Sequence, residues 1–410
     1  MYLDIKLIAK DTRMSDVVLI HYLQSMDNYW KNQDGQVLAI LVSLRHEHVI
    51  NKDLMLEHPE SMVERFIASP FNEIIVCHLK CVNAFNNGSY LEAFEFQSIL
   101  VKSLRKIIKN QRNQNWALPL FYSVCLDLRL LAQRVEKEGN VVEKSGEILE
   151  KAAACLLRCL YACTVDHLSS EENTKQIGVL TIVNQLFEIY LRINKLHLYM
   201  PLIKTIESSP FKNSFPLSQQ ITYRYLVGRK AMFEGDLSVA NQNLTYAFEN
   251  CHKVTKKNKQ LILISLVPVK MRIGFLPNRL VLEKYDVLQF WELIQAIRQG
   301  NLRLFDEIMT RHETFFNKFG IYLIVKKLKM IVYRNLFRKV YLILNTNQIP
   351  FQALQSALVY STQTDVDLEE PESIVNNLIF DRKINAYIST QDRKVVVSKQ
   401  NPFPSLIKFC

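Results

Sequence analysis

The sequence contains little glycine and little proline. Its 410 residues include ten glycines and twelve prolines, and proline is absent between Pro119 and Pro201 and between Pro277 and Pro350. Glycine supplies the positive φ angles of tight turns, and proline ends helices. Their scarcity therefore predicts long helices with short connections, and it argues against an all-β or doubly wound fold.

The sequence also lacks a long apolar segment. A secretory signal would need an apolar run where Asp4, Lys6 and Lys10 stand, and the longest later run, from Leu261 to Val269, falls short of the roughly 20 residues that cross a bilayer. The eight cysteines include no CxxC pair, the spacing typical of redox and zinc motifs. We therefore expect a soluble intracellular protein with reduced cysteines and without membrane insertion.

Motifs for catalysis or metal binding are missing as well. No phosphate-binding glycine loop, nucleophile elbow or paired-carboxylate pattern is present. A metal-dependent hydrolase would have to use His46 and His48, with His58 as a third ligand, but helical zinc sites need two histidines four positions apart. We expect no catalytic residue, no metal and no cofactor. Three cysteines at steps of four among small apolar residues favour close helix packing over a thiol site: Cys155, Cys159 and Cys163.

The positive charge of the chain is concentrated near its C-terminus. Residues 1–252 carry 27 Lys and Arg against 27 Asp and Glu, whereas residues 253–348 carry 18 against six. Residues 349–380 then hold five acids and no base, and residues 381–400 hold five bases and two acids. A localised basic surface of this kind indicates a polyanionic or acidic partner.

Helical periodicity begins early and continues through most of the chain. In NLRLFDEIMTRHETFF, from residue 301, apolar side chains recur at steps of three and four, which is typical of an amphipathic helix. Three predicted helix-turn-helix joints have a glycine, Gly88, Gly235 or Gly300, followed five positions later by Ala93, Ala240 or Phe305. The glycines share no fixed period, so residues 14–320 are predicted to form an irregular array of tetratricopeptide-like (TPR-like) helix pairs.

The pattern changes from about Ile321. A basic helical stretch, IYLIVKKLKMIVYRNLFRKVYLIL, is followed by a helix starting at Pro350 and by another through Ile374 and Ile379. In DRKINAYISTQDRKVVVSK, from residue 381, apolar residues alternate with polar ones on both sides of a turn, which predicts a hairpin. Three helices and a hairpin make a winged helix over residues 321–400, followed by an extended tail over 401–410. The stripe expected to be buried on the basic helix is Leu328, Val332, Leu336, Val340 and Leu344.

A helical array that runs into a terminal winged helix resembles the PCI architecture of proteasome-lid, signalosome and initiation-factor subunits. Within that class, the sequence is similar to the PCI-containing subunits of the second transcription-and-export complex, which couple transcription to messenger RNA export at nuclear pores. The segments that carry this resemblance are NWALPLFYSVCLDLR (115–129), VNQLFEIYLRINKLHL (183–198), YLVGRKAMFEGD (225–236), FGIYLIVKKLKMIVYRNLFRKVYLIL (319–344) and VVVSKQNPFP (395–404). Family members begin near Met14, so residues 1–13 are an extension that we expect to be dispensable.

The resemblance implies a non-enzymatic scaffold of the nucleus and the nuclear pore, with a further pool in the cytoplasm. Its winged helix would pack beside that of a larger scaffold subunit, and a small acidic disordered subunit would brace the helical region. The joined winged helices would form a positive platform for RNA or DNA next to nuclear pore components. The basic residues that match this platform are Arg382, Lys383, Arg393, Lys394 and Lys399 in and after the hairpin, with Arg334, Arg338 and Lys339 on the preceding helix.

Two further features allow alternative interpretations. Lys326, Lys327 and Lys329 are either a seat for an acidic partner or the solvated face of a helix. Phe403 is either a docking hook or part of a tail folded back on the winged helix. The same fold would also suit a PCI subunit of a proteasome-lid or signalosome-type assembly that does not bind nucleic acid.

Overall fold

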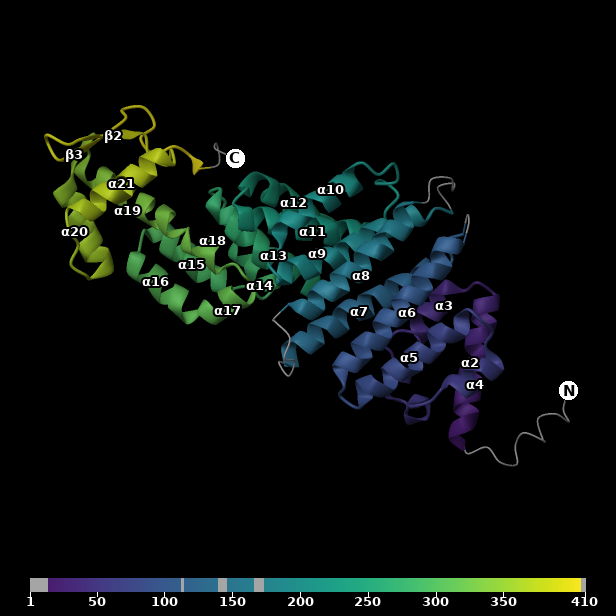
Figure 1. The fold of residues 1–410 in the computed structure, drawn as a ribbon. Coiled ribbons are helices and arrows are strands. Elements are labelled where there is room, and N and C mark those ends of the chain that lie inside the picture. The colour runs from purple at the N-terminus through teal and green to yellow at the C-terminus, as the bar shows by residue number, and fades with distance from the viewer. Residues whose placement is uncertain (1–13, 112–113, 139–145, 166–172, 407–410) are drawn as a thin grey trace. The chain divides into compact units, whose positions relative to one another are not determined.

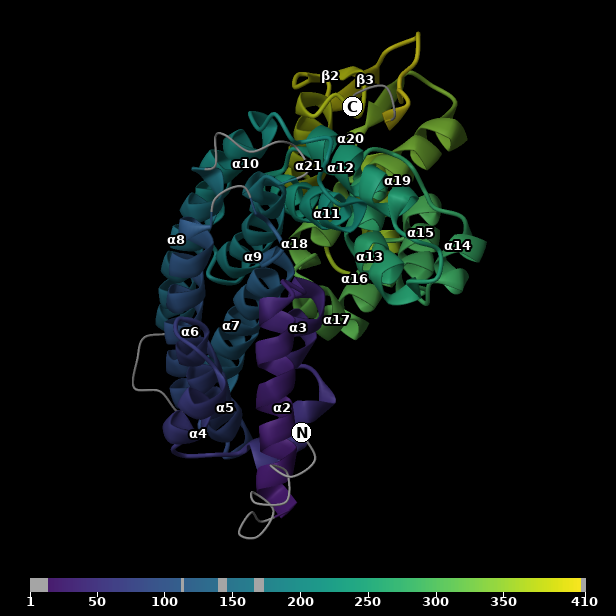
Figure 2. The same cartoon turned by 90° about the vertical axis from the view of Figure 1, so that its right-hand side faces the viewer.

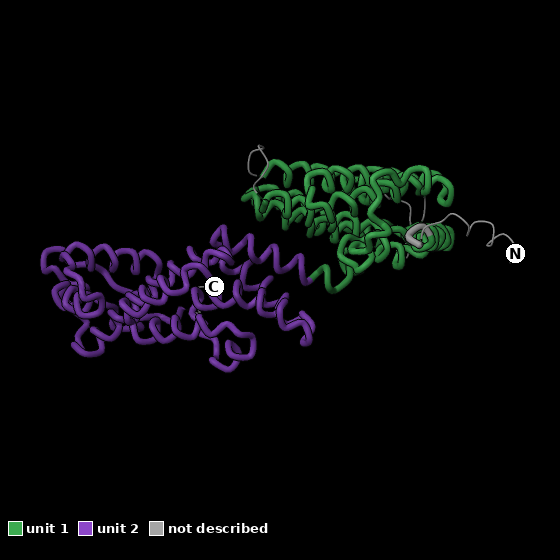
Figure 3. Tube along the Cα trace, turned by 90° about the horizontal axis from the view of Figure 1, so that it is seen from below, with its two compact units in different colours: residues 1–220 green, residues 221–410 purple. Residues whose placement is uncertain are grey.

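The computed structural model describes residues 14–406 apart from 112–113, 139–145 and 166–172, and most of these residues lie in helices (Figure 1). The predicted extension, residues 1–13, and the last four residues of the predicted tail lie outside the described residues. No helix in the described ranges is both long and apolar enough to cross a membrane. The chain divides into two compact units, residues 1–220 and 221–410 (Figure 3).

Unit 1 is built from antiparallel helices that pack on their neighbours in the chain. Helices α6, α7 and α8 lie side by side in both ribbon views (Figure 1 and Figure 2). Fully buried aromatic side chains, among them Phe71, Phe121 and Phe187, fill the space between the layers. The elements are α2 (Met14–Lys31), α3 (Gly35–Leu41), η1 (Glu47–Ile50), η2 (Lys52–Leu54), α4 (Glu60–Phe66), α5 (Phe71–Asn86), α6 (Tyr90–Asn110), α7 (Leu118–Glu138), α8 (Glu147–Thr164), η3 (Lys175–Gly178), α9 (Val179–Arg192), η4 (Leu196–Leu198) and α10 (Tyr199–Glu207).

Unit 2 holds the remaining helices and the only sheet among the described residues. The division between the units falls inside α11, and six further helices lie between α11 and the winged helix, which begins at about Ile321. The elements are α11 (Leu217–Glu234), α12 (Leu237–Asn250), α13 (Lys256–Arg272), α14 (Arg279–Lys284), α15 (Gln289–Gln299), α16 (Leu302–Arg311), α17 (Glu313–Lys318), α18 (Tyr322–Lys326), α19 (Lys329–Leu344), β1 (Gln348–Pro350), α20 (Phe351–Thr362), α21 (Glu369–Phe380), β2 (Ala386–Ser389) and β3 (Lys394–Val397).

The three predicted glycine joints are confirmed. Gly88, Gly235 and Gly300 have φ angles of +78°, +89° and +63°, and each lies between two consecutive helices. Left-handed backbone is accessible to glycine at little steric cost, so the chain can reverse direction within a few residues. The residues five positions later, Ala93, Ala240 and Phe305, are at most 1% exposed, as expected for positions where helices approach closely.

The winged helix is confirmed, with two differences in detail. The predicted basic helix is two helices, because Lys327 and Leu328 separate α18 from α19. A third strand, β1, pairs with β3, giving the antiparallel order β1-β3-β2. Val395 and Val397 of β3 are buried, in agreement with the alternation seen in the sequence.

The buried stripe expected on the basic helix is only partly present. Leu328, Val332 and Val340 are buried, but Leu336 is half-buried and Leu344 is 40% exposed. Leu344 is the last residue of α19, and the two residues before it, Leu342 and Ile343, are also exposed.

One hydrophobic core runs from the preceding helices into the winged helix. It includes residues of α11 and α13 at one end and of α21 and β3 at the other, and α19 packs on α15, α16, α20 and α21. The predicted boundary between residues 320 and 321 therefore does not interrupt the packing of unit 2. A winged helix that shares its core with the array is held rigidly in place within this unit.

Candidate nucleic-acid and partner interface

The hairpin directs its alternate side chains to opposite faces of the small sheet. Val395 and Val397 point into the core, so Lys394 and Val396 lie on the outer face. The register places Tyr387 opposite Val396 and Ser389 opposite Lys394. Tyr387 is 64% exposed, so the outer face of the sheet presents an aromatic ring near a lysine. Aromatic rings beside cations suit single-stranded nucleic acid, because bases stack on the ring while phosphates meet the charge.

Four of the predicted cations around the hairpin carry uncompensated charge. Arg382, Arg393 and Lys399 are exposed, and Lys394 is half-buried. Among the residues that the structure describes, no carboxylate lies within ion-pair distance of these four. Arg382 lies four residues before β2 and Arg393 lies in the turn between β2 and β3; their φ angles of +54° and +49° show that the chain turns sharply at each.

The cations predicted on α19 have different surroundings. Arg338 and Lys339 are both exposed near the C-terminal half of the helix. The ammonium of Lys339 donates a hydrogen bond of 2.7 Å to the carbonyl of Gln299, the last residue of α15. A lysine at a helix C-terminus is stabilised by the helix dipole, so the side chain has a structural partner as well as an exposed position.

Arg334 and Lys383 are buried, which contradicts the expectation that they form part of an exposed basic platform. They are 5% and 8% exposed. Nε of Arg334 donates to the carbonyl of Lys383 at 3.0 Å, and Nη2 donates to the carbonyl of Pro404 at 2.6 Å. Burial, with a smaller contribution from nearby Arg338, lowers the pKa of Arg334 to about 10. The guanidinium therefore fastens the C-terminal segment to α19, and no face of it is available to a phosphate.

The ammonium of Lys383 is also paired with a nearby carboxylate. Its ammonium lies 2.6 Å from Asp381 Oδ2. Burial lowers the pKa of Lys383, and the hydrogen bond that Lys383 donates to Asp381 opposes that shift. Sequence reasoning counted this charge as exposed because a residue before a hairpin has no periodicity that would show its direction.

Phe403 belongs to a tail that is folded back on the winged helix. Its ring centroid lies 5.6 Å from that of Tyr341 and 5.7 Å from the guanidinium carbon of Arg334. The same segment is held to the hairpin by Asn385, which donates from its backbone to Pro402 and from its side chain to Asn401, each at 2.9 Å. A half-buried ring with these contacts is part of the module, which favours the folded-back interpretation over the docking hook.

Lys326 and Lys327 line a groove beside α18, whereas Lys329 does not. Lys326 and Lys327 are exposed. The ammonium of Lys329 contacts both carboxylate oxygens of Asp306, at 2.9 and 2.7 Å, so its charge is offset. The groove, called here the α18 groove, encloses about 430 Å³ and is lined by Met232, Phe233, Gly235, Leu237, Arg272, Gly320, Leu323, Ile324, Lys326 and Lys327.

The winged helix also exposes large apolar side chains that sequence reasoning missed. Ile343 of α19, Tyr360 of α20 and Phe380 of α21 are 81%, 87% and 87% exposed. Each lies in the last turn of its helix, where apolar residues continue to the end of the helix. Large exposed apolar side chains such as these are candidates for a docking surface.

The candidate metal ligands are not brought together. His46 and His58 are exposed, and the half-buried ring of His48 lies beside His78 instead. In the described part of the chain, no group of three or more His, Cys, Asp or Glu side chains is arranged to hold a metal ion. The three cysteines at steps of four are buried in helix packing, as predicted: Cys155, Cys159 and Cys163.

Comparison with known proteins places this architecture in a family. The PCI domain family matches residues 309–399. The chain is 45% identical to PCI domain-containing protein 2 of Xenopus laevis, over 97% of this chain and 100% of that protein. It is 47% identical to the PCI domain-containing protein 2 homolog of Drosophila melanogaster, over 94% and 98%. A more distant relative, Protein CSN12 homolog of Neurospora crassa, is 29% identical over 80% of each chain.

The family match covers the winged helix and the last helices before it, and the relatives extend the likeness across both units. The predicted PCI architecture is therefore confirmed by sequence comparison as well as by the fold. The chain belongs to the family of PCI domain-containing protein 2 and is a PCI-domain scaffold protein.

Proposed function

We propose that this chain is a non-enzymatic scaffold subunit of a transcription-coupled messenger RNA export complex at the nuclear pore. In this proposal the winged helix docks against a larger PCI-type scaffold subunit and supplies cations to RNA or DNA. The family membership supports the scaffold role, and the resemblance of the sequence to export-complex subunits supports the assembly. Residence in the nucleus and at the pore follows from that assembly and is part of the proposal.

The observation that carries the nucleic-acid part is the free charge around the hairpin. Arg382, Arg393 and Lys399 are exposed and have no carboxylate partner in the described ranges, and Lys394 lies on the outer sheet face with Tyr387. Each lysine or arginine that neutralises a phosphate releases counterions, which gives affinity without sequence preference. The expected ligand is therefore any accessible single strand or duplex, with strong dependence on salt.

Docking of a larger subunit would use the exposed apolar residues. Burial of a large apolar side chain contributes about 1.5–3 kcal/mol. A partner that covers Ile343, Tyr360 and Phe380 would therefore gain binding free energy from each of them. The α18 groove suits the small acidic subunit, because Lys326 and Lys327 flank apolar Leu323, which is 72% exposed. Partner binding and nucleic-acid binding would thus use different residues of unit 2.

The nucleic-acid proposal is tested with two matched triple charge reversals. The first replaces Arg382, Arg393 and Lys399 by Glu. The control replaces three exposed lysines at the start of α13, which changes the net charge equally: Lys253, Lys256 and Lys257. Binding of a labelled single-stranded RNA is measured by fluorescence anisotropy over a range of KCl concentrations, for the chain alone and with its co-purified partner.

The hairpin variant should bind more weakly and should show a flatter salt dependence. Each lost phosphate contact lowers the slope of log affinity against log salt by about 0.7 for a single strand, so three contacts lower it by about 2. The control should change the slope by less than half of that. Equal losses in both variants would mean that only net charge matters, and unchanged binding in the hairpin variant would remove the hairpin from the interface.

A second candidate function keeps the fold and changes the assembly. The exposed apolar residues alone would suit a PCI subunit of a proteasome-lid or signalosome-type particle, in which the winged helix joins other subunits and does not bind nucleic acid. Crosslinking mass spectrometry on the native assembly separates the two. Crosslinks from α20 and α21 to nuclear-pore and export subunits favour the first, and crosslinks to lid or signalosome subunits favour the second.

A further inference from the structure

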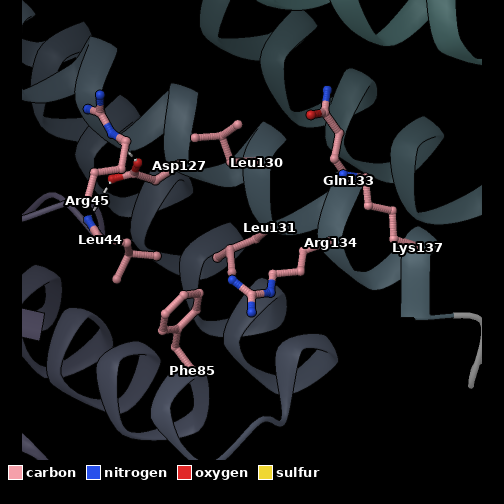
Figure 4. A pocket seen from close by; sticks show the side chains of 9 residues that line it. All are labelled: Leu44, Arg45, Phe85, Asp127, Leu130, Leu131, Gln133, Arg134 and Lys137. Atoms are coloured by element: carbon pink, nitrogen blue, oxygen red, sulfur yellow. Dashed lines mark hydrogen bonds and ion pairs between the residues drawn. The ribbon is translucent and has the colours of Figure 1, made fainter. Parts of the chain in front are cut away.

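Unit 1 contains a groove along α7 that none of the proposed functions uses. It encloses about 450 Å³. Figure 4 shows the side chains that line it. One wall comes from the segment after α3, another from the end of α5, and the floor from one face of α7. The residues on α7 recur at steps of three and four, so they form a single stripe along the helix. The α7 groove is lined by Leu44, Arg45, Phe85, Asp127, Leu130, Leu131, Gln133, Arg134 and Lys137.

Arg134 is held in place by aromatic rings and has no acidic partner. Its guanidinium carbon lies 4.3 Å from the ring centroid of Tyr90 and 5.3 Å from that of Phe85. Stacking of this kind fixes the plane of the guanidinium and leaves its N–H groups at the edges free to donate. Within the described ranges, no carboxylate lies in ion-pair distance of Arg134 or of Lys137 one turn later.

The second arginine of the groove is oriented by a buried carboxylate. Arg45 Nε donates to Asp127 Oδ1 at 2.9 Å, and Nη2 donates to Ser123 Oγ at 3.1 Å. The side chain of Asp127 is 0% exposed, and its other oxygen accepts from the backbone of Leu44 at 2.9 Å. Asp127 therefore compensates the charge of Arg45 from the buried side of the groove, and its own carboxylate is not accessible to a ligand. The groove is thus lined by three cationic side chains and one carboxylate, and the carboxylate is buried.

The apolar part of the groove decides between classes of ligand. Leu44, Leu131 and Phe85 line it with aliphatic and aromatic surface, and Leu130 is 37% exposed. A sugar-phosphate backbone would satisfy the cations but would leave this surface against polar atoms or water. A peptide that carries carboxylates next to large apolar side chains would satisfy both, because the apolar side chains cover the leucines while the carboxylates meet Arg134 and Lys137.

We propose that the α7 groove is a docking site for an acidic peptide segment with leucine-like side chains. The guanidinium of Arg134 would accept a carboxylate in its fixed plane, and Lys137 would add a second contact one turn along α7. This inference concerns unit 1 and does not depend on the nucleic-acid function proposed for the winged helix.

The test uses the full-length protein and a short fluorescein-labelled peptide of alternating Glu–Glu and Leu–Leu pairs. Binding by anisotropy is compared for the natural chain and for the double variant Arg134→Glu and Lys137→Glu. The matched control, Lys106→Glu and Lys109→Glu, reverses two exposed lysines with the same spacing on α6. A milder pair, Arg134→Gln and Lys137→Gln, covers the case in which the reversal disturbs folding, and Leu130→Gln tests the apolar contact.

We expect the groove reversal to weaken peptide binding by at least about tenfold, as loss of one or two charge-assisted contacts predicts. The glutamine pair should weaken binding in the same direction, Leu130→Gln by about threefold or more, and the control by less than twofold. The corresponding peptide with Gln in place of Glu should bind weakly to every variant. The proposal is overturned if the Glu peptide does not bind, if the control weakens it equally, or if an oligouridylate instead depends on Arg134 and Lys137.

Discussion

Acid should destabilise unit 1 through His78, a residue in the middle of α5. The side chain is 0% exposed, and neither ring nitrogen has a hydrogen-bond partner in the described part of the chain. Its ring centroid lies 5.6 Å from that of His48. Burial, with a smaller contribution from the neighbouring His48, lowers the pKa of His78 to about 3. The folded state therefore holds this imidazole neutral.

The direction and size of the effect follow from that shift. An unfolded histidine has a pKa of about 6.5, so protons bind to the unfolded chain first as the pH falls, and stability decreases between pH 6.5 and the folded pKa. Within this window the loss approaches about 1.4 kcal/mol per pH unit, which gives about 2 kcal/mol between pH 7 and pH 5 for His78 alone. At pH 7 and above, the group contributes no such penalty.

The assay compares the natural chain with His78→Leu and with the exposed control His252→Leu, all in a Trp291→Phe background. The remaining tryptophans, Trp30 and Trp116, lie in unit 1, and the ring centroid of Trp30 is 4.1 Å from that of Phe71 at the start of α5. Urea unfolding followed by their fluorescence, from pH 7.5 to pH 5, gives the stability of this unit.

His78→Leu should be at least as stable as the natural chain at pH 7, because it removes two buried nitrogens without partners. It should also lose about 2 kcal/mol less on going to pH 5, whereas His252→Leu should follow the natural chain. Equal pH slopes for His78→Leu and the natural chain would refute the assignment of acid sensitivity to this histidine.

Two predictions concern the packing of unit 2 and of the helix joints. Arg334→Met should lower the free energy of unfolding by about 2–4 kcal/mol, because it leaves two carbonyls without donors. Arg338→Met on the same helix should change it by less than about 0.5 kcal/mol. Urea unfolding followed by tryptophan fluorescence measures both, and equal effects would contradict a stabilising role for the hydrogen bonds of Arg334. Gly300→Ala should be strongly destabilising, since a Cβ there would lie 2.7 Å from the backbone of α19, while Gly88→Ala, with no atom within 4 Å, should cost only about 1 kcal/mol. Similar melting temperatures for the two alanine variants would show that the backbone conformation alone sets the cost.

The basic excess of the last third is only partly surface charge. Arg334 and Lys383 lie inside unit 2, and Lys329 is paired with Asp306, whereas Arg382 and Arg393 remain free. Composition counts each cation once and carries no information about its partner. The candidate nucleic-acid surface is therefore smaller and closer to the hairpin than the charge count indicated.

Local patterns in the sequence were sufficient to predict the architecture. These patterns involve residues that are close together in the chain. Apolar spacing of three and four predicts the helices, Gly88, Gly235 and Gly300 predict the joints between helices, and the alternation ending in Val397 predicts the hairpin. The winged helix and its place after a helical array could be predicted for the same reason. The strand β1 could not, because three residues are too few to show a period.

Tertiary packing decided which of the predicted site residues are available. Arg334 is buried because Lys383 and Pro404, 49 and 70 positions away, supply the carbonyls that it binds. Tyr360 and Phe380 are each 87% exposed in the part of unit 2 that the structure describes, although their spacing resembles that of buried residues. The periodicity of the sequence determines on which side of its helix a residue lies. Burial depends in addition on atoms that are distant in the chain, so only the folded structure determines which residues pack against that side.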